Sequence, residues 1–300
     1  MGKSAYVRVA LTDTEHMDIR ELVRDEYWPS LLEIPEPPKR LWAAGALPLA
    51  GTKLLAVVGS RALTSYGREA CAKLISGLAG YPISIVSGLA LGADAAAHRA
   101  ALAAGLHTIA VPGSGLAERA ISPHSNLGLA RDILASGGML LSEHEPDYLP
   151  HAYDFPSRNR IMVGMSDAVL VIEAGEKSGT LITARLACEY NRELLCVPHR
   201  IGDVHGFGSH LFLRLGATLV THPLHILEAL RIAPRLDGET TPAIKLEGNE
   251  KVMHDLIEEP KSRDDLVRLS KLSVGDALTA LVMLELKGLA KEEFGAWRRL

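Results

Sequence analysis

From residue 53 to residue 222 the chain alternates short apolar runs with amphipathic segments, and this alternation strongly restricts the possible folds. Seven runs, among them KLLAVVGS from residue 53 and DAVLVIEAG from residue 167, are almost continuously hydrophobic. Strands buried on both faces of a parallel sheet need such runs. Helices are predicted between them at residues 66–78, 90–104, 126–135, 158–165, 180–191 and 209–215. This order predicts a Rossmann-like, doubly wound, mostly parallel α/β sheet.

Changes in composition divide the 300 residues into four parts. Residues 1–48 are an N-terminal extension with a Pro-rich arm, and residues 49–232 form the predicted Rossmann-like domain. Residues 233–245 are rich in Pro, Gly and Thr, which predicts a linker. Residues 246–300 contain three helix-like segments and a short hairpin, the order of a winged-helix domain. The arm is expected to run irregularly and to dock onto the core through four apolar residues, the alternative being a simple linker: Trp28, Leu32, Leu41 and Trp42.

Hydropathy and charge narrow the class of protein. No apolar run reaches the roughly 18–20 residues that a membrane helix requires, and we see no apolar secretory signal. Cys71, Cys188 and Cys196 lie in apolar stretches and are expected to be reduced core thiols of a cytoplasmic protein. The formal net charge of −4 argues against coating of the whole surface by nucleic acid, although a local basic groove is compatible with it.

Small and polar residues follow the first three predicted strands. Gly59-Ser60-Arg61 follows the first, the segment that begins Ser87-Gly88 follows the second, and residues 112–115 (PGSG) follow the third. Glycine lets a backbone approach an anion, and arginine can bind a phosphate through two hydrogen bonds. Because ligands of open α/β sheets bind at the carboxyl ends of the strands, three such ends predict a phosphate-lined crevice.

The segment Phe155-Pro156-Ser157-Arg158-Asn159-Arg160 predicts the start of a helix. Ser157 is the expected N-cap, and Arg158 and Arg160 are expected in the first turn. The helix dipole favours acids at this end, so two arginines there indicate an anion site. The alternative is a pair of solvated arginines or an internal salt bridge.

Residues 173–180 (EAGEKSGT) join a predicted strand to the next helix, which Ser178 or Thr180 can cap. Lys177 stands before this helix, but the P-loop spacing is absent, which argues against an ATPase. Nucleophile-elbow, zincin and Cys-x-x-Cys motifs are also absent. Three histidines at 199, 205 and 210 lack suitably spaced further ligands, so we predict no metal site and no cofactor.

Five motifs occur here in the order that characterises one family: residues 58–61 (VGSR), 87–94 (SGLALGAD), 112–115 (PGSG), 155–161 (FPSRNRI) and 178–184 (SGTLITA). In these motifs residues 27–230 resemble the DprA family, also called Smf, and the tail is similar to the winged-helix domain of many members. The chain departs from the family pattern at Pro198-His199, at Gly208-Ser209-His210 and at Ala93-Asp94.

The resemblance implies a homodimeric recombination mediator that is not an enzyme. Such proteins bind and protect single-stranded DNA and load the recombinase RecA during natural transformation. Transferred to this sequence, the DNA and phosphate contacts are Gly59, Ser60, Arg61, Ser87, Gly88, Arg158, Asn159, Arg160, Lys177, Ser178, Gly179 and Thr180. With aromatic residues at 5%, we expect phosphate contacts to dominate and binding to depend strongly on salt.

Two alternatives remain for the crevice. One is a nucleotide-processing enzyme similar to the LOG-type phosphoribohydrolases, although their Pro-Gly-Gly-x-Gly-Thr motif with a following glutamate is absent. The other is a module that senses a nucleotide.

The tail carries nine Lys or Arg against eleven Asp or Glu, and its third helix lacks the basic face of a DNA-reading helix. We therefore expect the tail to mediate protein contacts.

Overall fold

The computed structural model describes residues 17–176, 178–235, 246, 248–257, 259–286, 289–293 and 295–299. Two compact units divide the chain, the first ending at Pro234 and the second beginning at Arg235. The N-terminal extension up to residue 16, Lys177 and residues 236–245 of the predicted linker lie outside the described residues. No helix within the described part is long and apolar enough to cross a bilayer.

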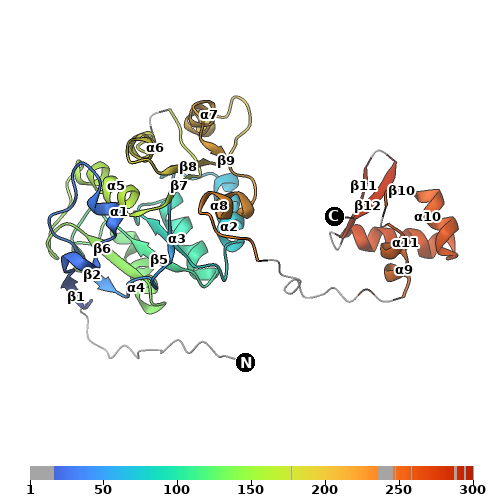
Figure 1. The fold of residues 1–300 in the computed structure, drawn as a ribbon, viewed down its shortest axis with the longest axis horizontal. Helices are drawn as coiled ribbons and strands as arrows, with labels where there is room; N and C mark the ends of the chain where they lie inside the picture. Colours follow the sequence, from blue (N-terminus) through green and yellow to red (C-terminus); the bar gives the residue numbers. More distant parts are fainter. Residues whose placement is uncertain are drawn as a thin grey trace. The chain divides into compact units, whose positions relative to one another are not determined.

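The first unit contains one mixed, mostly parallel sheet (Figure 1). In spatial order its described strands are β1 (Ile19–Glu21), β2 (Trp42–Gly45), β6 (Met139–Ser142), β5 (His107–Ala110), β4 (Ile83–Ser87), β3 (Lys53–Val58), β7 (Ala168–Val171), β8 (Glu193–Cys196) and β9 (Thr218–Leu219). The strands from β6 to β9 run parallel, whereas β1 and β2 pair antiparallel at one edge. The α/β class and all seven predicted strands are confirmed.

Helices cover both faces of this sheet. One face carries α1 (Pro29–Leu32), α5 (Asp154–Met165), α6 (Thr180–Glu189) and α7 (Phe207–Arg214). The other carries α2 (Ser65–Ser76), α3 (Ala93–Ala103), α4 (Leu127–Ala135) and α8 (Pro223–Ala229). Short 3₁₀ turns lie at Arg24–Glu26, His124–Asn126 and Val204–Gly206. Successive side chains of a strand point to opposite faces, so Leu54 packs in one core layer and Leu55 in the other.

The Pro-rich arm is more regular than expected. Trp42 begins strand β2, so the irregular conformation predicted there is wrong. Leu41 is fully buried, and Trp28 and Leu32 pack against the core. The expected thiol burial also needs a correction, because Cys71 and Cys196 are buried but Cys188 is exposed. Cys188 lies on an outer position of α6, which the apolar sequence around it did not reveal.

The second unit has its own core. It consists of α9 (Gly248–Leu256), β10 (Lys261–Ser262), α10 (Arg263–Ser270), α11 (Val274–Leu286), β11 (Ala290–Glu293) and β12 (Ala296–Arg299). The Ser262 hydroxyl caps α10 by accepting a hydrogen bond from the amide of Asp265 at 3.2 Å. Met253, Leu266, Leu281 and Trp297 are buried together. Within the described residues of this unit, three helices and a three-stranded sheet confirm the winged-helix prediction.

Candidate nucleic-acid interface

Strand order creates a crevice between β3 and β7. The chain moves from β3 through β4 and β5 to β6, then returns to place β7 on the other side of β3. The loops that follow β3 and β7 therefore diverge at a topological switch point, where open α/β sheets bind ligands. A cleft of about 690 Å³ lies there. Eight residues predicted for the site line it: Gly59, Ser60, Arg61, Arg158, Asn159, Ser178, Gly179 and Thr180.

Among the described lining residues, Arg61 is an exposed cation of this cleft. Its guanidinium carbon lies 5.3 Å from the centroid of the Phe155 ring, a cation–π arrangement that holds the side chain at the mouth. In the same loop the Ser60 hydroxyl accepts a hydrogen bond from the amide of Ala62 at 3.1 Å. Ala93 packs so closely against Gly59 that a Cβ on the glycine would lie 2.7 Å from the alanine methyl. The loop therefore needs glycine at position 59.

Arg158 lies beneath the cleft surface rather than at its rim. The side chain is 5% exposed, and its Nη1 donates hydrogen bonds to the carbonyl oxygens of Gly88, at 2.5 Å, and Val111. A Cβ on Gly88 would lie 1.9 Å from Nη1, so glycine is required for this contact. Gly88 thus shapes the site through Arg158. Ser87 is also buried and donates to the carbonyl oxygen of Val57 at 2.6 Å.

Asp94 balances the charge of Arg158, and the sequence prediction of the site did not include it. Its carboxylate is buried and accepts hydrogen bonds from the amides of Gly88 at 3.1 Å and Ala90 at 3.3 Å. Burial raises the pKa of Asp94, while the positive charge of Arg158 opposes that rise. Burial likewise lowers the pKa of Arg158. The sequence did contain a signal for this buried carboxylate, because Asp94 is an acid near the start of the apolar segment ADAAAH.

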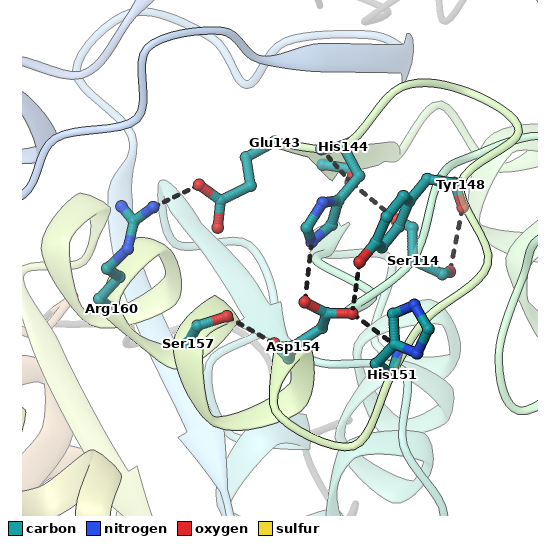
Figure 2. A network of polar contacts seen from close by, with 10 residues as sticks. Ser114, Glu143, His144, Tyr148, His151, Asp154, Ser157 and Arg160 are labelled. Atoms are coloured by element: carbon teal, nitrogen blue, oxygen red, sulfur yellow. Dashed lines mark hydrogen bonds and ion pairs between the residues drawn. The ribbon is translucent and has the colours of Figure 1, made fainter.

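Arg160 does not line this cleft, which corrects the expectation that both arginines face one site. It forms an ion pair with Glu143 and donates to the carbonyl oxygen of Glu36 at 2.6 Å. Figure 2 shows this ion pair from close by. Arg160 instead lines a separate hollow of about 660 Å³ next to the N-terminal arm, together with Arg24, Glu36, Pro37, Lys39, Arg40 and Glu143.

The predicted start of this helix was also wrong. Helix α5 begins at Asp154, and Ser157 lies inside it, with its hydroxyl donating to the carbonyl oxygen of Asp154 at 3.0 Å. Arg158 and Arg160 are therefore beyond the first turn. Two residues along a helix are separated by about 200° around its axis, which directs the two side chains to opposite faces.

The loop after β7 leads into α6 at the other wall of the cleft. The Ser178 hydroxyl accepts a hydrogen bond from the amide of Thr180 at 3.2 Å and donates to the Thr180 hydroxyl at 2.8 Å. Gly179 is the N-cap residue of α6 and supplies no side-chain cap, so the prediction that Ser178 or Thr180 caps this helix is wrong. The N-terminus of α6 lines the cleft, where the positive end of the helix dipole favours an anion.

The histidines near the cleft are used in loop packing. The Nε2 atom of His199 lies 3.0 Å from the carbonyl oxygen of Ile172, and Nε2 of His210 lies 3.0 Å from that of His199. His205 lines the cleft. Among the described residues, no group of three or more histidine, cysteine or acidic side chains is placed to hold a metal ion.

Comparison with known proteins places this geometry in a family. The family described as DNA recombination-mediator protein A matches residues 21–231, and the DprA winged helix domain matches residues 240–295. Protein Smf of Escherichia coli is 44% identical over 205 residues, which cover 68% of this chain and 54% of that protein. The DNA processing protein DprA of Streptococcus pneumoniae is 40% identical over 206 residues, which cover 68% of this chain and 72% of that one. This chain therefore spans only about half the length of the Escherichia coli relative.

Solved structures agree with the sequence matches. The structure of DprA from Streptococcus pneumoniae superposes with a TM-score of 0.66 at 39% identity, covering 71% of this chain and 75% of that one. DNA processing protein A from Helicobacter pylori superposes with a TM-score of 0.65 at 30% identity, covering 72% of this chain and 97% of that one. The resemblance stated from the five motifs is thereby confirmed. The chain belongs to the DprA (Smf) family of DNA recombination-mediator proteins.

Proposed function

We propose that this protein binds single-stranded DNA in the cleft between the β3 and β7 loops and acts as a recombination mediator. One observation carries the proposal. Arg61 stands exposed at the mouth of a cleft that also receives the N-terminus of α6. A guanidinium and the positive end of a helix dipole in one cleft favour a phosphate-bearing ligand. The predicted contacts of Gly59, Ser60, Asn159, Ser178, Gly179 and Thr180 would complete the binding surface.

The comparison with Helicobacter pylori supports a single strand as the ligand. The Helicobacter pylori protein is described as having a unique single-stranded DNA binding mode. In our proposal Arg158 supports the cleft from below and Arg61 contacts phosphate. Lys177 stays a phosphate contact predicted from sequence, because it lies outside the described residues.

Fluorescence anisotropy with labelled oligonucleotides tests this function. We expect single strands to bind more tightly than duplexes of equal length. The logarithm of the affinity should fall steeply with the logarithm of salt concentration, by about 0.7 for each phosphate neutralised on a single strand. A flat salt dependence, or equal affinity for duplex, would contradict the proposal.

The recombinase role belongs to the same proposal. We infer that the protein protects single strands and loads a RecA-type recombinase onto them in the cytoplasm during natural transformation, as the family description of a recombination mediator suggests. The test is filament formation by a purified RecA-type recombinase on oligonucleotides coated with single-strand-binding protein. Addition of this protein should accelerate filament formation, and an unchanged rate would count against loading.

We further propose a binding function without catalysis. Asp94 is the one carboxylate among the described cleft-lining residues, and two backbone amides already occupy it. It is therefore poorly placed as the acid or base that a phosphoribohydrolase requires. Release of a free base from nucleoside monophosphates would overturn this proposal and favour the enzyme.

The homodimer that the family resemblance implies has a candidate surface at the β9 edge of the sheet. Five large apolar side chains are exposed there: Val204, Phe207, Leu211, Leu215 and Leu219. Leu215 alone is 75% exposed, and the β9 strand presents an unpaired edge within the described sheet. We propose that a second copy covers this surface. Analytical ultracentrifugation should show a dimer that Leu215→Glu dissociates, whereas Leu49→Glu, at a residue 82% exposed outside this surface, should leave it intact.

The winged-helix unit is proposed to contact protein rather than duplex DNA. On α11 the exposed positions include the acids Asp276 and Glu285 and the apolar residues Val282 and Met283. A recognition helix that reads the major groove needs basic or amide side chains instead. Because the unit has its own core, a fragment of residues 246–300 can be tested alone. Duplex binding by this fragment at physiological salt would contradict the proposal.

A further inference from the structure

The loop between β6 and α5 carries aromatic and imidazole rings in two stacked pairs. His144 stacks on Tyr148 with ring centroids 4.2 Å apart and planes 11° apart. His151 stacks on Tyr153 with centroids 5.4 Å apart and planes again 11° apart. An edge contact between Tyr148 and His151, with centroids 6.1 Å apart, joins the two pairs. Four rings within ten residues thus form one continuous array.

The buried carboxylate of Asp154 fixes this array. Its Oδ2 accepts hydrogen bonds from the amide of His151 at 2.7 Å and from the hydroxyl of Tyr148 at 3.0 Å. The ring of His144 approaches the other carboxylate oxygen at 3.9 Å. Figure 2 shows these three residues converging on Asp154. These contacts fix the rings before any ligand binds. A ligand that stacks on them therefore causes little further loss of side-chain conformational entropy.

The outer pair of the array faces solvent, although it is held in place. Tyr153 is 68% exposed and His151 is also exposed, while His144 and Tyr148 are half-buried. A single exposed aromatic residue is ordinary on a protein surface. A stacked pair of exposed rings on a loop anchored by a buried carboxylate is better explained as a surface for another flat ring.

In the chain, the outer pair directly adjoins residues that line the cleft. Ala152, between His151 and Tyr153, lines the cleft, and so do the next two residues after Asp154, namely Phe155 and Pro156. Phe155 in turn lies under the guanidinium of Arg61. The loop therefore places aromatic faces beside the cation that we assign to phosphate, the combination by which proteins hold single strands.

We propose that His151 and Tyr153 form a stacking platform for the bases of the strand whose phosphates Arg61 contacts. This inference rests on the proposed function, since it names the part of the same ligand that the loop recognises. Every nucleobase has a π face, so the platform should tolerate any sequence and should distinguish a strand with bases from one without them.

The test compares two ligands of equal length and charge. One is oligo(dT), and the other is an abasic oligonucleotide with the same number of phosphates. We expect Tyr153→Ala to weaken oligo(dT) binding roughly 30-fold, the middle of the range for loss of one base–aromatic stack, and to leave abasic binding unchanged. Tyr66→Ala, which removes a 47% exposed tyrosine outside the cleft lining, is the matched control and should change neither affinity.

A second variant reports stacking directly. Tyr153→Trp keeps a large aromatic ring and should retain oligo(dT) affinity, and its indole fluorescence should be quenched by oligo(dT) but not by the abasic strand. The thermal unfolding midpoint of each variant identifies any loss of fold.

The outcomes separate this inference from the proposed function. Unchanged oligo(dT) binding by Tyr153→Ala would overturn the platform, and so would an equal loss for both ligands. In either case the wild-type protein would still bind single strands. Failure of the wild-type protein to bind any single strand would instead overturn the proposed function itself.

Discussion

The buried guanidinium of Arg158 donates a hydrogen bond to the carbonyl oxygen of Gly88, 70 residues earlier in the chain, with 2.5 Å between the two atoms. This contact joins α5 to the loop after β4 and places a positive charge in the same buried region as the Asp94 carboxylate. Arg158 therefore has a structural task that is separate from DNA contact.

Replacing Arg158 should destabilise the fold. In Arg158→Met the Asp94 carboxylate loses its compensating charge, so the free energy of unfolding should fall by about 3–5 kcal/mol. Urea denaturation measures this change. The exposed Arg61→Ala is the control and should change stability by less than about 0.5 kcal/mol. In the double variant Arg158→Met/Asp94→Asn part of the loss should be recovered, and a strictly additive loss would show that the two charges are not coupled.

Arg61→Ala should affect binding without affecting stability. Loss of a charge-assisted contact costs about 1.5–3 kcal/mol, which corresponds to a roughly 10- to 150-fold weaker Kd for single strands. The slope of log affinity against log salt should become shallower by about 0.7, because one phosphate contact is lost. Arg99→Ala, at an exposed arginine outside the cleft lining, serves as the control and should retain both the Kd and the slope. A loss shared equally by both variants would indicate a nonspecific charge effect.

Two glycine substitutions should change stability in opposite directions. In Gly88→Ala the new methyl would meet the Arg158 guanidinium, so we expect a loss of about 1–3 kcal/mol. Gly128 lies exposed on α4 with open space around it, and Gly128→Ala should stabilise the protein by roughly 0.4–1 kcal/mol. Denaturant midpoints measure both, and a Gly88→Ala protein as stable as wild type would show that the buried arginine can move aside.

His98 should make the protein sensitive to mild acid. The ring is fully buried with Nδ1 2.8 Å from the Thr108 hydroxyl, and burial lowers the pKa of His98 to about 3. Below pH 6.5 the His98 ring is protonated in the unfolded chain but stays neutral in the folded protein. The free energy of unfolding therefore falls as pH falls from 6.5 toward 3. The loss from this one group should be about 1 kcal/mol between pH 6.5 and 5.5.

The variant His98→Asn isolates that effect. Its amide can retain the hydrogen bond to Thr108 but does not titrate, so urea denaturation at the two pH values should show a smaller acid loss than wild type. Equal pH dependence of the two proteins would mean that His98 is protonated in the fold.

Much of the architecture could be read from the sequence because it depends on local patterns. Continuous apolar runs such as Lys53–Val58 identify buried parallel strands wherever they pair, and glycine-rich ends mark the edge where ligands bind. Strand β2 was not predicted because its four residues lie in a Pro-rich segment. Its pairing partner, β6, is nearly a hundred residues away in the chain.

The amino-acid sequence by itself determined the α/β class, the winged-helix tail and the motifs that gather at the strand ends, because hydrophobic periodicity and turn residues act over short distances. Only the tertiary structure decided which cations reach the cleft. Arg61, Arg158 and Arg160 are chemically identical, but the first is exposed, the second is buried against Gly88 and the third is paired with Glu143. The burial of each arginine and its hydrogen-bond or ion-pair partners depend on residues brought together from distant parts of the chain. Local sequence patterns do not contain that information.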